Sequence, residues 1–138
     1  LVFGFAVIGV LKILIVDDEP DIMNSLKEGF IRKKFDVDGY TDPIEALKNH
    51  KVNVYDFLLL DVKMPKMNGF QLYRELIKQG EKGKVLFMTA YENYHAAFLK
   101  AFPELDHRQF IKKPTTLSAM INRVSDEIPP EEQVARKP

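Results

Sequence analysis

Four short apolar runs recur along the chain, and a charged or hydroxyl residue follows each of them. The runs occupy residues 13–16, 57–60, 85–88 and 110–111. The first three are strongly apolar, as strands of a parallel sheet are when both faces of the sheet are covered. Segments with helical spacing of apolar residues lie between them. This alternation predicts an α/β fold, in which a parallel sheet with right-handed crossovers carries helices on both faces.

Turn and capping signals divide the chain into five strands and five helices that alternate. We expect strands at 12–16, 36–40, 56–60, 84–88 and 109–112. We expect helices to begin at Pro20, at Pro43 after an Asp42 N-cap, after Asn68 and Gly69, near Asn93 and near Thr116. The strand at 36–40 is short and half polar, which predicts an edge position. The expected fold is therefore a doubly wound, five-stranded parallel sheet.

Composition narrows the class of protein. The 138 residues fit one domain, and 20 basic residues balance 20 acidic ones. The formal net charge is zero, whereas nucleic-acid binders typically carry a cluster of basic residues, so no nucleic-acid partner is expected. The chain has no cysteine, which excludes disulfides, zinc–thiolate sites and thiol catalysis. This composition fits the reducing cytoplasm.

The two ends of the chain differ from the rest. Residues 1–11 are uncharged and apolar, but a membrane span needs about 20 such residues. They also lack the basic start of a signal peptide. We therefore expect an apolar N-terminal extension that does not insert into a membrane and that suits an oligomer contact, such as a homodimer. Residues 12–128 would form the domain, and residues 129–138 a polar tail or the start of a linker.

Five polar residues end the predicted strands: Asp17, Asp18, Asp61, Thr89 and Lys113. In open α/β sheets, ligands bind beyond the carboxyl ends of the strands. Three carboxylates packed together repel one another, and a cation relieves that repulsion. Oxygen ligands select Mg²⁺ or Mn²⁺ over softer metals. Because the chain has no glycine-rich phosphate loop of the GxxxxGK type, a carboxylate is the candidate phosphoryl acceptor. Asp61 directly follows the apolar run at 57–60.

The segments VDDEP, LLLDVKMPKMNG, MTA and FIKKP, in this order and spacing, resemble the receiver domain of two-component response regulators, including the chemotaxis regulators. The resemblance covers residues 12–128. It implies the flavodoxin-like strand order 2-1-3-4-5. It also implies a phosphorylation-controlled signalling switch, to which a histidine kinase or a histidine phosphotransfer protein donates the phosphoryl group.

The resemblance assigns the metal and acceptor residues by position. Asp61 matches the phospho-accepting aspartate. Asp18 and Asp61 match carboxylates that bind Mg²⁺, and Asp17 matches one that acts directly or through water. Lys63 matches the residue whose backbone carbonyl completes the metal site.

The resemblance also assigns the switch. Thr89 matches the hydroxyl residue that hydrogen-bonds the phosphoryl group, and Lys113 the lysine that pairs with it. Phe110 matches the aromatic residue whose rotamer couples phosphorylation to the outer surface. That surface comprises the fourth helix, fifth strand and fifth helix, and would bind an effector or a second copy. A cis bond between Lys113 and Pro114 is also implied.

Three alternatives remain open from the residues alone. A degenerate receiver would act only as a protein-binding module, although the full acidic set speaks against it. An aspartate-dependent phosphatase of the haloacid dehalogenase type would need D-x-D after a strand, which Asp61, Val62 and Lys63 do not supply. A flavin or nucleotide binder would need a phosphate loop where Asp17 and Asp18 stand. We therefore expect no enzyme beyond the chain's own phosphotransfer and dephosphorylation.

Other residues carry open or ordinary interpretations. His50, His95 and His107 lack ligand spacing and are expected on the surface or in loops. Tyr91, Tyr94 and Phe98 fit either the core or a partner surface around the fourth helix, because aromatic residues favour both.

Overall fold

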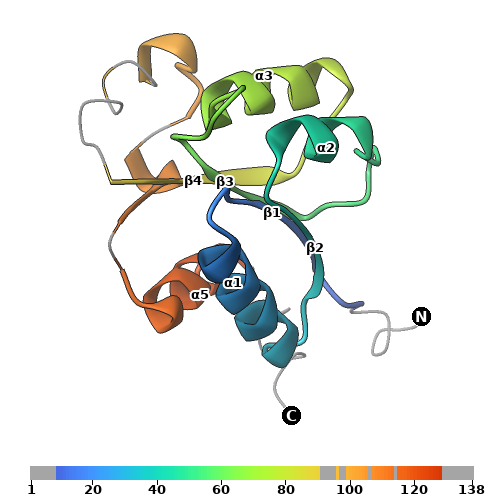
Figure 1. Ribbon diagram of the computed structural model, residues 1–138, viewed down its shortest axis with the longest axis vertical. Coiled ribbons are helices and arrows are strands. Elements are labelled where there is room, and N and C mark those ends of the chain that lie inside the picture. The colour runs from blue at the N-terminus through green and yellow to red at the C-terminus, as the bar shows by residue number, and fades with distance from the viewer. Residues whose placement is uncertain (1–8, 91–95, 97–98, 106, 114, 129–138) are drawn as a thin grey trace.

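The computed structural model of the chain describes residues 9–90, 96, 99–105, 107–113 and 115–128. Within this part, five strands alternate with helices along the chain (Figure 1). Residues 96 and 99–101 are helical, but most of the predicted fourth helix lies outside the described residues. The predictions for Tyr91, Tyr94, His95, Phe98 and the peptide bond before Pro114, like those for most of the extension and the tail, also fall outside them.

The strands form one parallel sheet in the order β2-β1-β3-β4-β5, which confirms the predicted topology. Their bounds are β1 (Lys12–Val16), β2 (Asp36–Tyr40), β3 (Phe57–Asp61), β4 (Lys84–Thr89) and β5 (Phe110–Lys112). β2 lies at the edge, as its polar sequence predicts. β3 begins and ends one residue later than predicted, because Asp56 precedes it with its carboxylate accepting the Lys12 N–H (2.8 Å), while Asp61 pairs with Met88.

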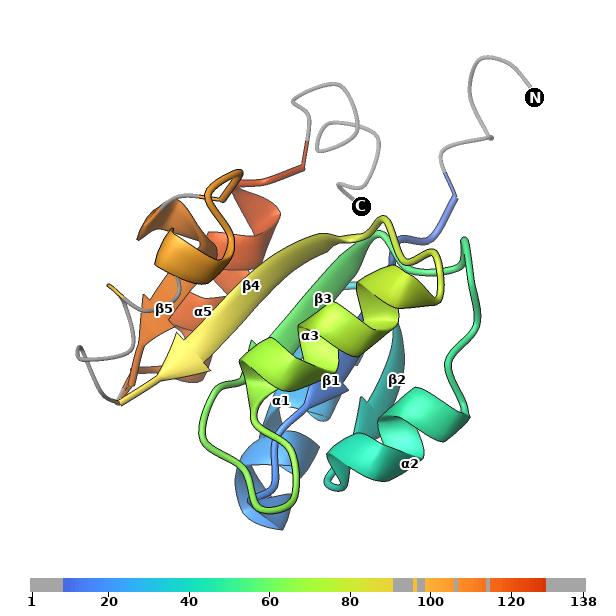
Figure 2. The same cartoon turned by 90° about the horizontal axis from the view of Figure 1, so that it is seen from above.

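Helices cover both faces of the sheet. α1 (Pro20–Arg32) and α5 (Leu117–Ser125) lie on one face, and α2 (Pro43–Lys48) and α3 (Gly69–Lys78) on the other (Figures 1 and 2). A short 3₁₀ helix, η1 (His107–Gln109), precedes β5. No helix among the described residues is long and apolar enough to cross a membrane.

The core has two halves, one on each face of the sheet. Ile13 and Ile15 point to the α1 and α5 side, whereas Leu14 and Val16 point to the α2 and α3 side. All four are at most 1% exposed. Burial on both faces explains why the strands are continuous apolar runs rather than alternating ones.

Local signals set the starts of the helices. Pro20 opens α1, and the Asp42 carboxylate caps α2 by accepting the Ile44 N–H at 2.9 Å. α3 begins with a capping box, in which the Asn68 and Gln71 side chains each accept the other's backbone N–H. In α1, Phe30 is buried, whereas its neighbour Ile31 is 50% exposed.

Candidate functional site

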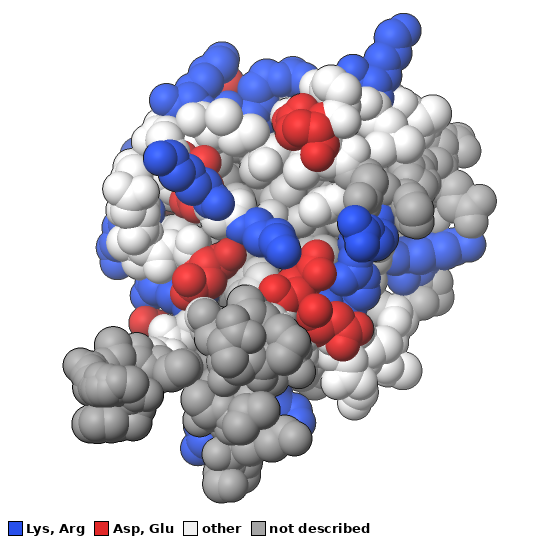
Figure 3. All heavy atoms as spheres, turned by 180° about the vertical axis from the view of Figure 1, so that it is seen from behind, with Lys and Arg blue, Asp and Glu red and all other residues white. Residues whose placement is uncertain are grey.

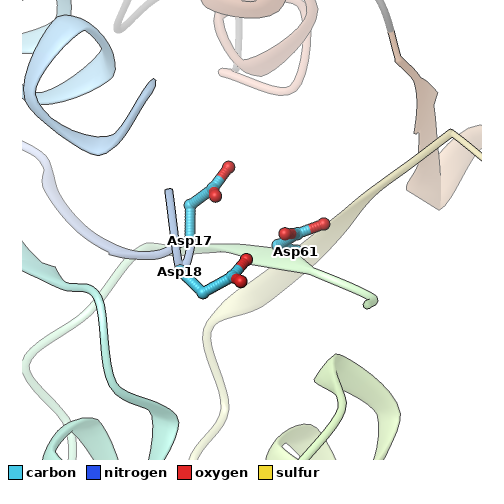
Figure 4. Close-up of side chains that lie close together, drawn as sticks. All are labelled: Asp17, Asp18 and Asp61. Carbon is cyan, nitrogen blue, oxygen red and sulfur yellow. The ribbon is translucent and has the colours of Figure 1, made fainter. Parts of the chain in front are cut away.

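Three aspartates gather at the carboxyl edge of the sheet (Figure 4). Asp17 and Asp18 follow β1, and Asp61 is the last residue of β3. Because Val16 pairs with Leu60 in the parallel register, the next residues along the two strands come side by side. One oxygen from each carboxylate lies within 4.8 Å of the others. The sequence-predicted acidic trio therefore forms one cluster.

Asp17 is fully buried and held at both carboxylate oxygens. Its Oδ1 accepts the backbone N–H of Glu19 at 3.0 Å, and its Oδ2 accepts a hydrogen bond from Lys113 Nζ at 3.0 Å. Its own N–H donates to the carbonyl of Tyr40 in the edge strand (3.1 Å). These partners fix the position of its negative charge beside the other two acids.

Lys113 places a cation among the carboxylates. Its Nζ lies 3.5 Å from Asp61 Oδ1 in addition to its hydrogen bond with Asp17. Burial favours its neutral form, but the hydrogen bond to Asp17 and the charge of Asp61 outweigh burial, so the pKa of Lys113 is raised. Its backbone N–H donates to the Thr89 carbonyl at 2.8 Å, which ties the lysine to the end of β4.

The surroundings of Asp61 stabilise its negative charge less than those of Asp17 do. Burial, followed by the charge of Asp17, raises the pKa of Asp61 to about 7, although Lys113 opposes the shift. Its side chain accepts no fixed backbone N–H comparable to the one that Glu19 gives Asp17, among the bonds of the described residues. Lys113 therefore compensates the ionised form only in part, and a cation would add to that compensation.

The donor set fits a hard divalent cation. Carboxylate oxygens within 4.8 Å of one another are the ligands that Mg²⁺ and Mn²⁺ prefer, and Mg²⁺ usually takes only one or two protein carboxylates and keeps several waters. The cluster holds three acids and one nearby ammonium, so a cation also lowers the mutual repulsion. Lys63 has an exposed side chain in the loop after β3, and the role of its carbonyl stays a prediction.

The two predicted switch residues lie on β4 and β5. Thr89 is the last residue of β4, is 7% exposed, and directly follows Met88, which pairs with Asp61. Phe110 begins β5 and is half-buried. Its ring lies among aromatic side chains, 5.9 Å from the Phe87 ring centroid. The structure thus brings Thr89 to the acidic edge and sets Phe110 on the face that α3 covers.

The loop after β3 requires glycine at its end. A Cβ on Gly69 would lie 2.3 Å from the carbonyl oxygen of Asp61, which is closer than real contacts allow. The Gly69 N–H donates to the Val62 carbonyl at 2.9 Å. This close approach seats the first turn of α3 against the backbone of Asp61.

A cavity opens beside the site, between α1 and the segment from β5 to α5. Its volume is about 500 Å³, within the range of binding pockets. Lys113 lies at its boundary with the acidic cluster, and apolar side chains line much of the rest: Ile22, Leu26, Leu117 and Met120. Sequence patterns gave no signal for this cavity, because its walls come from segments about 90 residues apart.

A second buried polar pair lies away from the acidic cluster and was not foreseen. His50 does lie in a loop, as expected, yet its side chain is 0% exposed. Its Nε2 is 2.5 Å from Glu81 Oε1 and its Nδ1 is 2.8 Å from Gln79 Oε1. This pair joins the segment after α2 to the one after α3. The partner of His50 lies 31 positions away in the sequence, so no local sequence pattern predicts this pair.

Together, the doubly wound sheet and its carboxyl edge define an α/β domain suited to a divalent cation and a phosphoryl group. Comparison with known proteins gives the family. Residues 13–125 match the response regulator receiver domain. The chain belongs to this family of two-component signalling domains. Receiver domains are phosphorylation-controlled switches that bind Mg²⁺ at an acidic pocket and interact with histidine kinases and effector domains.

Curated relatives are bacterial regulators that are longer than this chain. Regulatory protein VanRB of Enterococcus faecalis is 31% identical over 117 residues, which cover 83% of this chain and 50% of VanRB. Transcriptional regulatory protein CiaR of Streptococcus pneumoniae is 40% identical over 83 residues, or 60% of this chain and 37% of CiaR. The chain thus spans half or less of the length of these relatives.

Solved receiver structures share the fold. The non-phosphorylated HemR receiver domain from Leptospira biflexa has a TM-score of 0.74 at 28% identity, covering 84% of this chain and 92% of that one. CheY in the CheX–CheY–BeF3–Mg²⁺ complex from Borrelia burgdorferi is similar at a TM-score of 0.69 and 27% identity, covering 84% and 87%. These matches confirm the predicted fold class.

Proposed function

We propose that this chain is a signalling switch in which Asp61 accepts a phosphoryl group from a phosphohistidine on a histidine kinase or a histidine phosphotransfer protein. One observation carries the proposal: the buried Asp61 carboxylate lies 3.5 Å from Lys113 Nζ and within one cluster with Asp17 and Asp18. A nucleophile, a cation-binding set and an ammonium are thereby assembled around the space where a phosphoryl group would arrive.

The transfer follows from this arrangement. A carboxylate oxygen of Asp61 forms the new P–O bond while the P–N bond to the donor histidine breaks, and the imidazole nitrogen keeps the bonding electron pair. Lys113 stabilises the negative charge on the transferred oxygens. Asp17, Asp18, Asp61 and the Lys63 carbonyl would hold Mg²⁺ or Mn²⁺, which would offset the charge of the carboxylates and the phosphoryl group. Water later hydrolyses the acyl phosphate, so the chain catalyses only its own phosphorylation cycle.

The switch itself is assigned to Thr89 and Phe110. The buried hydroxyl of Thr89 would hydrogen-bond the new phosphoryl oxygens, because Thr89 ends the strand next to Asp61. Its movement would free space for the Phe110 ring to reorient. A local charge change thereby biases a two-state element at the start of β5.

The surfaces suggest how partners would approach. The cavity beside Lys113 would receive apolar side chains of the phosphodonor, since it opens next to the acidic cluster. An effector or a second copy would bind the face that includes β5 and α5. Acidic and basic side chains are interspersed on the face shown in Figure 3, and the net charge is zero. This balance supports protein partners rather than nucleic acid. The absence of cysteine fits the reducing cytoplasm as the site of action.

Intact-mass measurement after incubation with acetyl phosphate tests the proposal. With Mg²⁺, we expect one added phosphoryl group on the wild-type chain. Asp61→Asn should gain none, and removing the metal with EDTA should lower the modified fraction. An unchanged wild-type mass with Mg²⁺ would contradict the proposal and leave a passive binding module. Release of phosphate from small phosphate esters would instead favour a phosphatase.

A further inference from the structure

Aromatic rings form a continuous cluster on the face of the sheet that α3 covers. Its described members come from α3, β4, the segment before η1, and β5: Phe70, Tyr73, Phe87, Phe102 and Phe110. The cluster includes Phe110, to which the proposed function assigns the switch. Its neighbours therefore set which orientations that ring can adopt.

Phe70 lies at the centre of this cluster. Its ring centroid is 5.1 Å from that of Phe87, 6.2 Å from that of Phe110 and 6.5 Å from that of Phe102. The contacts with Phe87 and Phe110 are edge-to-face, at 69° and 77°, which is a favourable geometry for aromatic pairs. One side chain of α3 thus contacts β4, β5 and the segment before η1.

Phe70 is also joined rigidly to the acceptor residue. It follows Gly69, where even a methyl group would come 2.3 Å from the Asp61 carbonyl oxygen. The Asn68 and Gln71 capping box holds the first turn of α3 together. A shift of the backbone at Asp61 should therefore move Phe70 as well, since the two segments are already in contact.

The two walls beside Phe110 differ in their freedom. Phe87 is 0% exposed and is the register partner of Phe110 across β4 and β5, so it forms a fixed wall. Phe70 and Phe110 are both half-buried. Of these two neighbouring rings in the described part of the chain, Phe70 is therefore the one that can yield.

We propose that Phe70 is a positioning residue that couples the loop at Asp61 to the orientation of Phe110. This route runs from Asp61 through Gly69 and the first turn of α3, and it is separate from the route through Thr89. The inference rests on the proposed function, because it requires that phosphorylation of Asp61 reorients Phe110. It adds α3 to the elements that transmit the signal to the β5 surface.

Fluorine NMR of chain labelled with 4-fluorophenylalanine tests this coupling. The chain has ten phenylalanines, and loss of one resonance in Phe110→Leu assigns the signal of Phe110. Spectra are recorded before and after acetyl phosphate with Mg²⁺, and intact mass gives the phosphorylated fraction in the same samples. The variants are Phe70→Leu, Phe70→Met, which keeps apolar volume without a ring, and the control Tyr73→Leu. Tyr73 lies in the same helix and contacts Phe87 and Phe102.

We expect phosphorylation to move the Phe110 resonance in the wild type and in Tyr73→Leu. Both Phe70 variants should lose at least half of that movement while being phosphorylated to the same extent. If Phe70→Leu does not fold, Phe70→Met decides. A full movement in a phosphorylated Phe70 variant, or an equal loss in Tyr73→Leu, would overturn this inference alone. A wild-type chain that gains no phosphoryl group would overturn the proposed function and this inference with it.

Discussion

Replacing Asp61 with asparagine should stabilise the folded chain at neutral and alkaline pH in the absence of metal. The substitution keeps the shape of the side chain but removes its ionisation. In the wild type, burial and the nearby charge of Asp17 disfavour the ionised form of Asp61. The folded state therefore carries an electrostatic cost that the asparagine variant lacks.

The size of the effect follows from the shift in pKa. The pKa of Asp61 rises from 3.8 to about 7 on folding. Each unit of difference in pKa between the unfolded and folded states corresponds to about 1.4 kcal/mol of unfolding free energy. The upper limit is therefore about 4 kcal/mol, and relaxation of the site makes about 2–4 kcal/mol the expected range. Because the folded state holds the proton more tightly, this group costs nothing below pH 3.8. Its cost grows as the pH rises to about 7 and stays constant above that.

Urea unfolding of the two proteins in EDTA, at several pH values between about 4 and 8, measures this difference. Titrating groups remote from Asp61 contribute equally to both proteins and cancel in the comparison. We expect the gap in unfolding free energy to widen up to pH 7. Adding Mg²⁺ at pH 8 should narrow it, because the cation binds the wild-type carboxylates and stabilises the folded state. A gap that does not change with pH would refute the electrostatic account of the site.

Substitutions at three further positions test other parts of the structure. Lys113→Met should slow phosphoryl acceptance by at least about 10-fold, because it removes the ammonium that lies 3.5 Å from Asp61. Lys113→Arg keeps a positive charge and should retain more of the wild-type rate. Timed intact-mass measurements compare the rates of the two variants. His50→Ala should lower the unfolding free energy by about 3 kcal/mol in urea, because it leaves the buried Glu81 without its 2.5 Å partner; an equal loss in an exposed variant such as Lys48→Ala would contradict this. Gly69→Ala should lower the unfolding free energy by about 2 kcal/mol or more, since its Cβ would clash with the Asp61 carbonyl. It should also weaken Mg²⁺ binding measured by calorimetry. Wild-type stability and Mg²⁺ affinity in this variant would show that the loop can move to accept the methyl group.

Local patterns were enough to predict the sheet and the position of its acidic edge. Runs such as 57–60 are apolar throughout because both faces are covered, and this periodicity is visible in the sequence. The strand order came from the family resemblance. Once the order is known, parallel pairing brings Asp17, Asp61 and Lys113 to one edge. The convergence of these side chains is thus a consequence of topology.

Contacts between distant segments could not be predicted in the same way. The burial of His50 depends on Glu81, and the setting of Phe110 depends on Phe70. Each pair joins loops or elements whose relative placement is set by the whole fold, so neither residue carries a local signal of its partner. In α1, helical periodicity also left open whether Phe30 or its neighbour Ile31 faces the core, because both lie close to the same stripe.

The two buried aspartates differ in how far fixed partners compensate their negative charge. Asp17 receives the Glu19 N–H and the Lys113 ammonium at 3.0 Å each, so its charge is compensated by partners that are already in place. Asp61 lies farther from the same ammonium, at 3.5 Å, and is repelled by Asp17. Asp17 thereby positions Lys113 and leaves Asp61 as the carboxylate with the most to gain from a cation or a change of charge. An exchange of these roles would require Asp17 to leave its two hydrogen bonds, and this difference supports the proposal that residue 61 is the acceptor.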